Sequence, residues 1–164
     1  MSIMGLFGSG NIDDRNREVI LYILDKLKKF GVGRLKLMKL MFLLEHYDIS
    51  SEKLTPDKLL GNDFIIYWRG PFSFQVYRSF LHLLENGEIL EKGRLLTLET
   101  EPDQDRLKSK IGEEILKKLN KVLKEFGELD GLELEKRSMK LLGIKQEEKQ
   151  HYVGIPVDVV ISGS

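Results

Sequence analysis

Apolar residues recur at steps of three and four over much of the chain, which is the spacing that brings them onto one face of a helix. This pattern predicts a first helix over about 13–30 and a second over 34–47, joined by the short turn Gly31-Val32-Gly33. The second segment is apolar nearly all round its axis, so we expect it to be the buried, central helix. Lys36 and Lys39, three residues apart, should form a narrow solvent-exposed stripe on it.

The next segment contains a helix-start pattern, an apolar run and a Gly-Pro pair. Thr55-Pro56-Asp57 is typical of a helix start, because threonine can cap the first turn and proline suits the first helical position. We therefore predict a short helix that ends near Leu60. The apolar run at 64–68 predicts a buried strand. Gly70-Pro71 then forces a turn, because glycine allows unusual backbone angles and proline fixes its own φ.

A further helix is predicted to start at this turn. Ser73 can cap a helix over 74–85 by accepting a backbone N–H, and Asn86-Gly87 should end that helix. Two short apolar segments, 88–91 and 94–99, flank a Lys-Gly pair and predict a β-hairpin. Helices followed by a helix and a two-stranded hairpin resemble a winged helix, so we expect a winged-helix-like core.

Beyond Glu101-Pro102-Asp103, which interrupts the chain, the pattern is again helical. We predict one helix over 104–126 and a shorter one over 132–142. Residues 153–161 are β-branched and apolar with Pro156 inside, which predicts a terminal edge strand or a docked extended tail. The chain is thus predicted to be a mainly α domain with a small β-hairpin, divided into a flexible leader (1–12), a core (13–100) and a C-terminal helical extension of the same domain (101–164).

Composition narrows the classes of function. The chain has 164 residues, which is enough for one buried core, and its 26 basic and 26 acidic side chains balance. No overall field therefore favours nucleic acid or a membrane surface. The absence of cysteine excludes disulfides and thiolate zinc sites, and the three histidines lie too far apart for a metal-ligand spacing. No apolar run approaches the ~20 residues that span a bilayer, and we expect a cytoplasmic protein.

No arrangement of residues is typical of catalysis. The glycine clusters at 5–10 and 31–33 follow no predicted strand and lack the Lys-Ser/Thr of a phosphate loop. Carboxylate pairs such as Glu113-Glu114 are typical of solvated helix faces. Ser73 has only His82 as a nearby base, and helix capping explains that serine better than catalysis. We therefore expect a non-enzymatic protein with no cofactor and no metal.

The most informative polar positions lie on the predicted helix over 74–85. In a winged helix, this face would meet base edges and phosphates, whereas many modules of similar topology contact proteins instead. Glu85, Glu88 and Glu91 close by disfavour strong binding to phosphates. Contact with a partner protein is therefore the leading interpretation, and DNA binding by a winged-helix regulator is the alternative. The predicted contact residues are Arg69, Phe72, Gln75, Arg78, Ser79 and His82.

Three motifs also point to a family. The helix segment Leu35–Phe42 repeats Leu and Lys, Tyr67–Ser73 contains an aromatic-x-Gly-Pro pattern, and Val76-Tyr77 follows on the next helix. Together with Leu84–Ile89, these segments resemble the Panacea domain of SocA-like antitoxins and proteolytic adaptors, and the related uncharacterised YwgA-like proteins.

The resemblance covers roughly 18–98 and implies a mostly helical interaction domain without catalytic residues. In toxin–antitoxin versions, such a domain neutralises a toxin by binding it, or hands a client to a protease. The implied partner is thus a protein, either a toxin or a protease client. Two departures stand out: Arg69 occupies a position where the family often has tyrosine, and the chain from Glu101 onward matches nothing in the pattern.

Overall fold

The computed structural model describes the backbone of residues 2–163 and the side chains of residues 12–163. Strands within this range form small antiparallel hairpins, which pair β1 (Tyr47–Asp48) with β2 (Lys53–Leu54), β3 (Ile65–Tyr67) with β4 (Gly70–Phe72), and β5 (Ile89–Lys92) with β6 (Leu95–Leu98). The helices are α1 (Ser2–Lys26), α2 (Arg34–His46), α3 (Phe74–Glu85), α4 (Gln104–Ile111), α5 (Glu113–Phe126), α6 (Gly131–Leu142) and α7 (Val157–Gly163), with a 3₁₀ helix η1 over Gln146–His151. The predicted class, mainly α with small β-structure, is confirmed.

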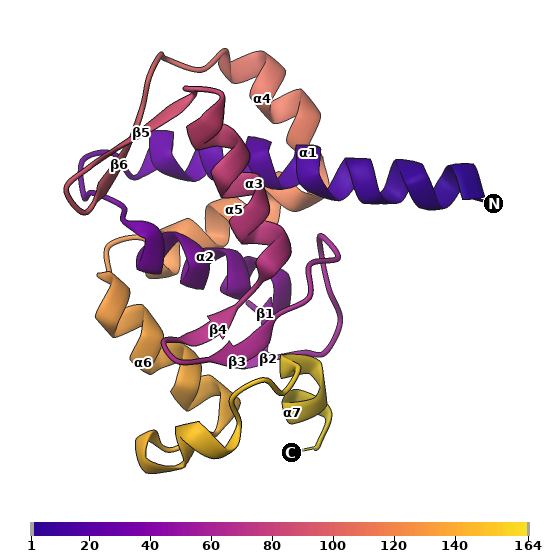
Figure 1. Cartoon of the computed structure of the whole chain (residues 1–164), viewed down its shortest axis with the longest axis vertical. Coiled ribbons are helices and arrows are strands. Elements are labelled where there is room, and N and C mark those ends of the chain that lie inside the picture. The colour runs from indigo at the N-terminus through magenta and orange to yellow at the C-terminus, as the bar shows by residue number, and fades with distance from the viewer. Residues whose placement is uncertain (1, 164) are drawn as a thin grey trace.

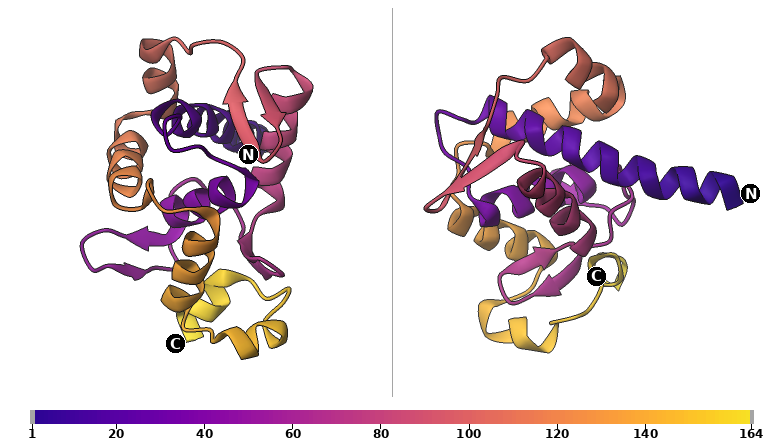
Figure 2. Two further views of the ribbon diagram at one scale, coloured as in Figure 1. Left: turned by 90° about the vertical axis from the view of Figure 1, so that its left-hand side faces the viewer. Right: turned by 45° about the horizontal axis from the view of Figure 1, so that its top comes forward.

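Helix α2 lies at the centre of the molecule (Figure 1). It packs against α5, α6 and β4, whereas α1 packs against α3, α4 and β6. A view from the side shows the same order, with α1 above α2 and the C-terminal segment below (Figure 2). Within residues 2–163, no helix combines the length and the apolar character that a membrane span requires.

The predicted burial of α2 is confirmed and goes further than expected. Every residue of this helix from Lys36 to His46 is buried. The predicted solvent-exposed stripe is wrong, because Lys36 and Lys39 are only 5% and 2% exposed. The helix is covered by α6 and β4 as well as by α5, so no side remains open to water over most of its length.

Helix α1 has different bounds from the predicted ones. Its backbone is helical from Ser2, so the predicted leader over 1–12 is helical from that residue on, and its flexibility stays a prediction. At the other end, α1 stops at Lys26 and not at Phe30. The chain turns there because the Gly31 N–H bonds to the Leu27 carbonyl, with Gly31 in the left-handed region at φ +81°.

The predicted short helix over 55–60 is absent, because α2 binds the backbone of the loop that follows. The Glu45 side chain is 1% exposed and accepts hydrogen bonds from the N–H groups of Leu60, Gly61 and Asn62. The Asn62 side chain in turn forms a reciprocal pair of 2.8 Å bonds with Asn16 of α1. These tertiary bonds take the place of the local helical bonds that Thr55-Pro56-Asp57 had indicated.

The predictions for α3 and the hairpin after it are confirmed. Ser73 caps α3 by accepting a 3.3 Å hydrogen bond from the Val76 N–H. Gly87 ends the helix in the left-handed region at φ +72°. The strands β5 and β6 pair as predicted, and the Leu96 N–H also bonds to the Val32 carbonyl in the turn between α1 and α2.

In the second half of the chain, one predicted helix is broken in two. The single helix expected over 104–126 is divided at Gly112, whose φ of +90° is incompatible with a continuous helix. The predicted apolar stripe is nevertheless buried, because both helices direct it into one core. Asp130 and Glu133 form a capping box at the start of α6, and Gly143 ends that helix as predicted.

The predicted terminal strand is partly wrong. Residues 154–157 bond to β3 through their backbone, as a docked tail would, but Gly154 lies in a turn with φ at +92° and Val157 already begins helix α7. The Pro156 carbonyl accepts the N–H groups of Val159 and Val160, so the proline precedes a helical turn and does not interrupt a strand. Most of the β-branched residues that suggested a strand, from Val157 to Ile161, lie in this short helix.

We expect Glu45→Gln to lower the free energy of unfolding by about 2 kcal/mol, because the new amide group would face backbone N–H donors with a donor of its own. Both carboxylate oxygens of Glu45 accept backbone bonds, so either amide orientation loses at least one. Urea unfolding followed by circular dichroism measures the effect. Glu85→Gln, at an exposed position on α3, is the control and should change stability by less than about 0.5 kcal/mol. Equal stabilities for the two variants would contradict this role of Glu45.

Candidate protein-interaction surface

Large aromatic side chains gather where the β3–β4 hairpin meets the start of α3. Trp68 in the hairpin turn is 61% exposed, Phe74 at the first position of α3 is 56% exposed, and Tyr67 is 38% exposed. Exposed aromatic clusters of this kind are unfavourable in water and are enriched in protein interfaces. We define the aromatic surface as Tyr67, Trp68, Phe72, Phe74 and Tyr77.

Ring contacts hold four members of the aromatic surface in place. The partly buried Phe72 lies at the middle, with its ring centroid 5.4 Å from Tyr67, 5.0 Å from Phe74 and 5.7 Å from Tyr77. These separations fall in the range that aromatic pairs prefer. The hairpin register places Tyr67 opposite Gly70, so the Trp68–Arg69 turn projects at the end of this cluster.

A buried lysine supports the hairpin from beneath. Lys39 of α2 donates a 2.8 Å hydrogen bond from Nζ to the Pro71 carbonyl oxygen. Gly70 lies directly above, with φ at +89°, and a Cβ there would approach Lys39 Cε to 3.3 Å. Glycine is thus required at this turn by both backbone conformation and space. Burial lowers the pKa of Lys39 from 10.5 to about 7, against the opposing effect of the Glu135 carboxylate.

Glu135 of α6 joins this arrangement to the C-terminal segment. Its side chain, 12% exposed, accepts hydrogen bonds from Arg69 Nε at 3.0 Å and from Lys149 Nζ at 3.2 Å. One carboxylate thus connects the hairpin turn, α6 and η1. Because the Arg69 side chain is still 60% exposed, its guanidinium is oriented by Glu135 while it remains accessible beside Trp68.

The structure brings only some of the predicted contact residues together. Phe72 and Arg69 belong to or border the aromatic surface. Arg78 is exposed one turn after Phe74 on α3, so it lies at the edge of the same surface. A contact role for these three residues stays a prediction.

The other predicted residues, of which only Ser79 is buried, form contacts with the rest of the protein. Ser79 is fully buried, so its expected exposure is wrong; its hydroxyl donates to Asp13 Oδ1 at 2.6 Å. His82 Nδ1 lies 3.3 Å from Asp13 Oδ2, and Gln75 accepts the Asp63 N–H. These side chains connect α3 to α1 and to the loop before β3. The helical period had placed them on a polar face, but α1 covers part of that face.

Sequence reasoning missed most of the aromatic surface. The apolar run at 64–68, which contains Tyr67 and Trp68, had predicted a buried strand, and Phe74 and Tyr77 of the predicted helix over 74–85 were not among the predicted contact residues. The available signal was the density of aromatic residues, because five of them fall within eleven positions that also contain a turn. A hairpin with only three residues in each strand is too small to bury so many aromatic rings.

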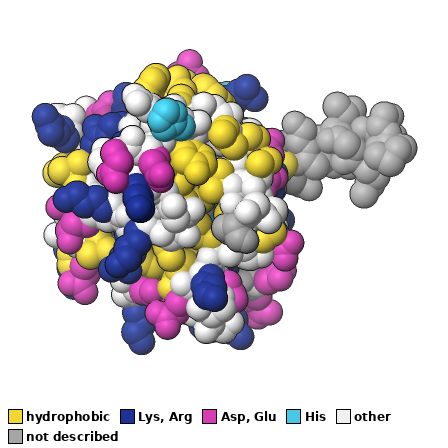
Figure 3. Space-filling model, turned by 90° about the horizontal axis from the view of Figure 1, so that it is seen from below, with side chains coloured by type: hydrophobic (Ala, Val, Ile, Leu, Met, Phe, Trp, Pro, Cys, Tyr) yellow, Lys and Arg dark blue, Asp and Glu magenta, His cyan; other side chains and the backbone are white. Residues whose placement is uncertain are grey.

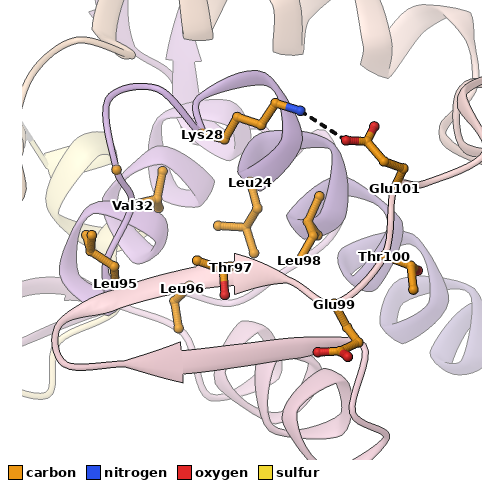
Figure 4. Close-up of a pocket in the computed structure, with 11 residues that line it drawn as sticks. Leu24, Lys28, Val32, Leu95, Leu96, Thr97, Leu98, Glu99, Thr100 and Glu101 are labelled. Carbon is orange, nitrogen blue, oxygen red and sulfur yellow. Dashed lines mark hydrogen bonds and ion pairs between the residues drawn. The ribbon is translucent and has the colours of Figure 1, made fainter.

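A separate cavity offers no catalytic arrangement. It has a volume of about 350 Å³ and lies between the end of α1 and β6 (Figure 4). Aliphatic side chains including Leu24, Leu96 and Leu98 line it, and Lys28 and Glu101 form a 3.3 Å ion pair at its rim. Among the described residues, no group of three or more His, Asp or Glu side chains is placed to hold a metal ion.

The pH dependence of stability should report the burial of Lys39. Between pH 7 and 10.5, an unfolded chain keeps the proton that folded Lys39 releases, so stability rises with pH in this window. Relative to Lys39→Met, the wild type should therefore gain about 2 to 3 kcal/mol from pH 6 to pH 9. Urea unfolding at both pH values measures this difference. Lys136→Met, at an exposed position on α6, should follow the wild type; a Lys39→Met variant that also does so would contradict the prediction.

Comparison with known proteins identifies the family but supplies no closer relative. No curated protein and no solved structure matches the chain, so nothing supports the winged-helix likeness or the DNA-binding alternative beyond the sequence pattern. One family model does match, that of the antitoxin SocA-like, Panacea domain, over residues 37–141. This range contains most of α2, the β3–β4 hairpin, α3 and nearly all of α6, and thus Lys39, Gly70 and Glu135. The chain belongs to the SocA-like antitoxin family that carries the Panacea domain.

Proposed function

We propose that this protein is a non-enzymatic interaction module, antitoxin-like or adaptor-like, which binds a partner protein through the aromatic surface. The observation that carries this proposal is the exposure of Trp68, Phe74 and Tyr67 on one supported surface of a family domain. Membership of an antitoxin family supports a toxin or a protease client as the class of partner.

The chemistry of the surface suits a protein interface. Aromatic side chains bury about 150–250 Å² each, and each Å² of apolar area removed from water contributes roughly 25 cal/mol. Trp, Tyr and Arg are also the residues that most often dominate binding energy. Here Arg69 and Arg78 lie at the edges of the rings, where they can pair with carboxylates of a partner without losing all contact with water.

The bonds that already fix the hairpin should lower the entropic cost of binding a partner. The Lys39–Pro71 hydrogen bond, the Arg69–Glu135 ion pair and the ring contacts of Phe72 already fix the hairpin. Fewer groups then have to become ordered on association, so more of the contact energy appears as affinity. The bound partner would be neutralised by occlusion of its own surface, or delivered to a protease while it is held.

We expect Trp68→Ala to weaken partner binding by about 30-fold or more, which corresponds to roughly 2 kcal/mol for loss of a central aromatic residue. Full-length protein serves as bait; a captured partner is identified, purified and titrated against each variant by calorimetry. Phe30→Ala removes an aromatic side chain that is 43% exposed outside the aromatic surface, and it should leave affinity unchanged. Equal affinities of the Trp68→Ala variant and the wild type would place the contact elsewhere.

Trp68 also provides a direct optical signal, because it is the only tryptophan in the chain. Burial of its ring in an interface should shift the fluorescence emission to shorter wavelength when the partner is added.

Labelled duplex DNA tested at two salt concentrations addresses the alternative function. A salt-dependent, sequence-selective complex that Arg78→Ala abolishes would overturn a function limited to protein binding.

A further inference from the structure

Strand β3 has a neighbour on each side. One edge pairs with β4, and the other is occupied by residues 154–157 of the C-terminal tail. The Ile66 N–H donates to the Ile155 carbonyl at 2.9 Å, and the Gly154 N–H donates to the Ile66 carbonyl at 2.7 Å. The Val157 N–H donates to the Phe64 carbonyl at 2.9 Å. The tail therefore bonds to the edge of β3 as an added antiparallel strand does.

The register places one apolar residue of the tail in the core. Ile65 pairs with Pro156, so Val157 stands opposite Phe64 and Ile155 opposite Ile66. Phe64, Ile66 and Val157 are all at most 1% exposed. The bound segment thus has a simple pattern: main-chain hydrogen bonds fix its path, and one aliphatic side chain, that of Val157, enters the core.

The short helix that continues from the tail is partly exposed. In α7, Val157 is buried while Val159 is 58% exposed. A hollow of about 220 Å³ also lies beside the Ile65–Pro156 pair, between the tail and the loop that contains Asp63. Figure 3 shows the molecule from the side of this segment, where hydrophobic side chains form separate patches among charged ones.

The tail covers a strand edge that adjoins the proposed binding surface. The family match ends at residue 141, so β3 lies inside the matched range and the tail lies outside it. The covered edge continues directly into Tyr67 and Trp68 of the aromatic surface. A partner seated on those rings would therefore have the edge of β3 within reach of an extended segment.

We infer that the outer edge of β3 is an acceptor for an extended segment of the partner protein, and that residues 154–157 occupy this edge in its absence. This inference rests on the proposed function and adds the kind of contact that the partner makes. The segment that fits has an aliphatic residue at the position that Val157 occupies in the tail, where it can fill the same buried space. The tail and the partner segment compete for the same main-chain groups of Phe64 and Ile66.

The edge can be tested without the partner, by using a fluorescent synthetic peptide with the sequence of residues 152–163 as the probe. The attached tail competes with this peptide at an effective concentration on the order of millimolar. Val157→Ala in the full-length chain removes the buried anchor of the attached tail, so the peptide should bind this variant roughly ten times more tightly than it binds the wild type. Val159→Ala, at the exposed position two residues later, should leave peptide affinity as in the wild type. No binding to any of these chains, or equal affinity for all three, would overturn the inference.

A disulfide that fixes the tail on β3, and that can be reduced again, should weaken binding of the peptide. Ile65 and Pro156 form a non-hydrogen-bonded antiparallel pair, whose short Cα separation suits a disulfide, and the chain has no cysteine of its own. We combine Ile65→Cys and Pro156→Cys with Val157→Ala. The oxidised protein should bind the peptide at least ten times more weakly than the reduced protein. Equal binding in the two states would show that the peptide does not use this edge.

Hydrogen exchange on the wild type tests the same opening without any substitution. The amides of Ile66, Gly154 and Val157 should exchange together and at least ten times faster than the amides of α2, because release of the tail exposes them without unfolding the core. Exchange only by global unfolding would overturn the inference. These results do not depend on Trp68→Ala. If the disulfide has no effect while Trp68→Ala still weakens partner binding, the inference fails and the proposed function stands.

Discussion

The buried polar side chains of α2 position the chain between Thr55 and Pro71. A helix covered on nearly all sides must satisfy its charged and polar groups inside the protein, because an unpaired buried group costs several kcal/mol. Glu45 accepts the backbone N–H groups of residues 60–62, and Lys39 donates to the Pro71 carbonyl. His46 contacts the Thr55 carbonyl oxygen through Nδ1 at 2.9 Å. Helix α2 thus fixes the chain at three places, namely Thr55, residues 60–62 and Pro71.

This constraint explains how a small hairpin can present a large aromatic surface. A two-stranded hairpin of three residues per strand has little stability by itself. Here the Lys39 ammonium lies beneath the turn, Gly70 leaves room for it, and Glu135 orients Arg69 from the other side. Exposed rings that would otherwise favour collapse or aggregation are thereby held in one arrangement. Lys39, Gly70 and Glu135 support the hairpin from within, and the exposed rings of the same hairpin and of α3 are the groups that we propose for binding.

The same hairpin relates the range matched by the family model to the rest of the chain. Residues 37–141 match the family model, and they include most of α2, the hairpin and Glu135. The tail beyond that range returns to the hairpin through backbone bonds to β3, and Lys149 returns to it through Glu135. Glu135 therefore connects the hairpin turn to η1, the segment that precedes the tail.

The sequence by itself determined the local elements and the family. Helical periodicity located α2, α3 and α6, local capping chemistry gave Ser73 and Gly143, and the short motifs around Leu35–Phe42 and Tyr67–Ser73 led to the Panacea domain. Only the tertiary structure decided what covers each face. Periodicity reports which residues share a side of a helix, but not what packs against that side. Lys39 and Ser79 were thus predicted to be exposed and are buried, while Trp68, which was predicted to lie in a buried strand, is open to solvent. Similarly, the loop at 55–60 and the tail at 154–157 take their shapes from long-range hydrogen bonds to Glu45 and β3, which no local pattern encodes.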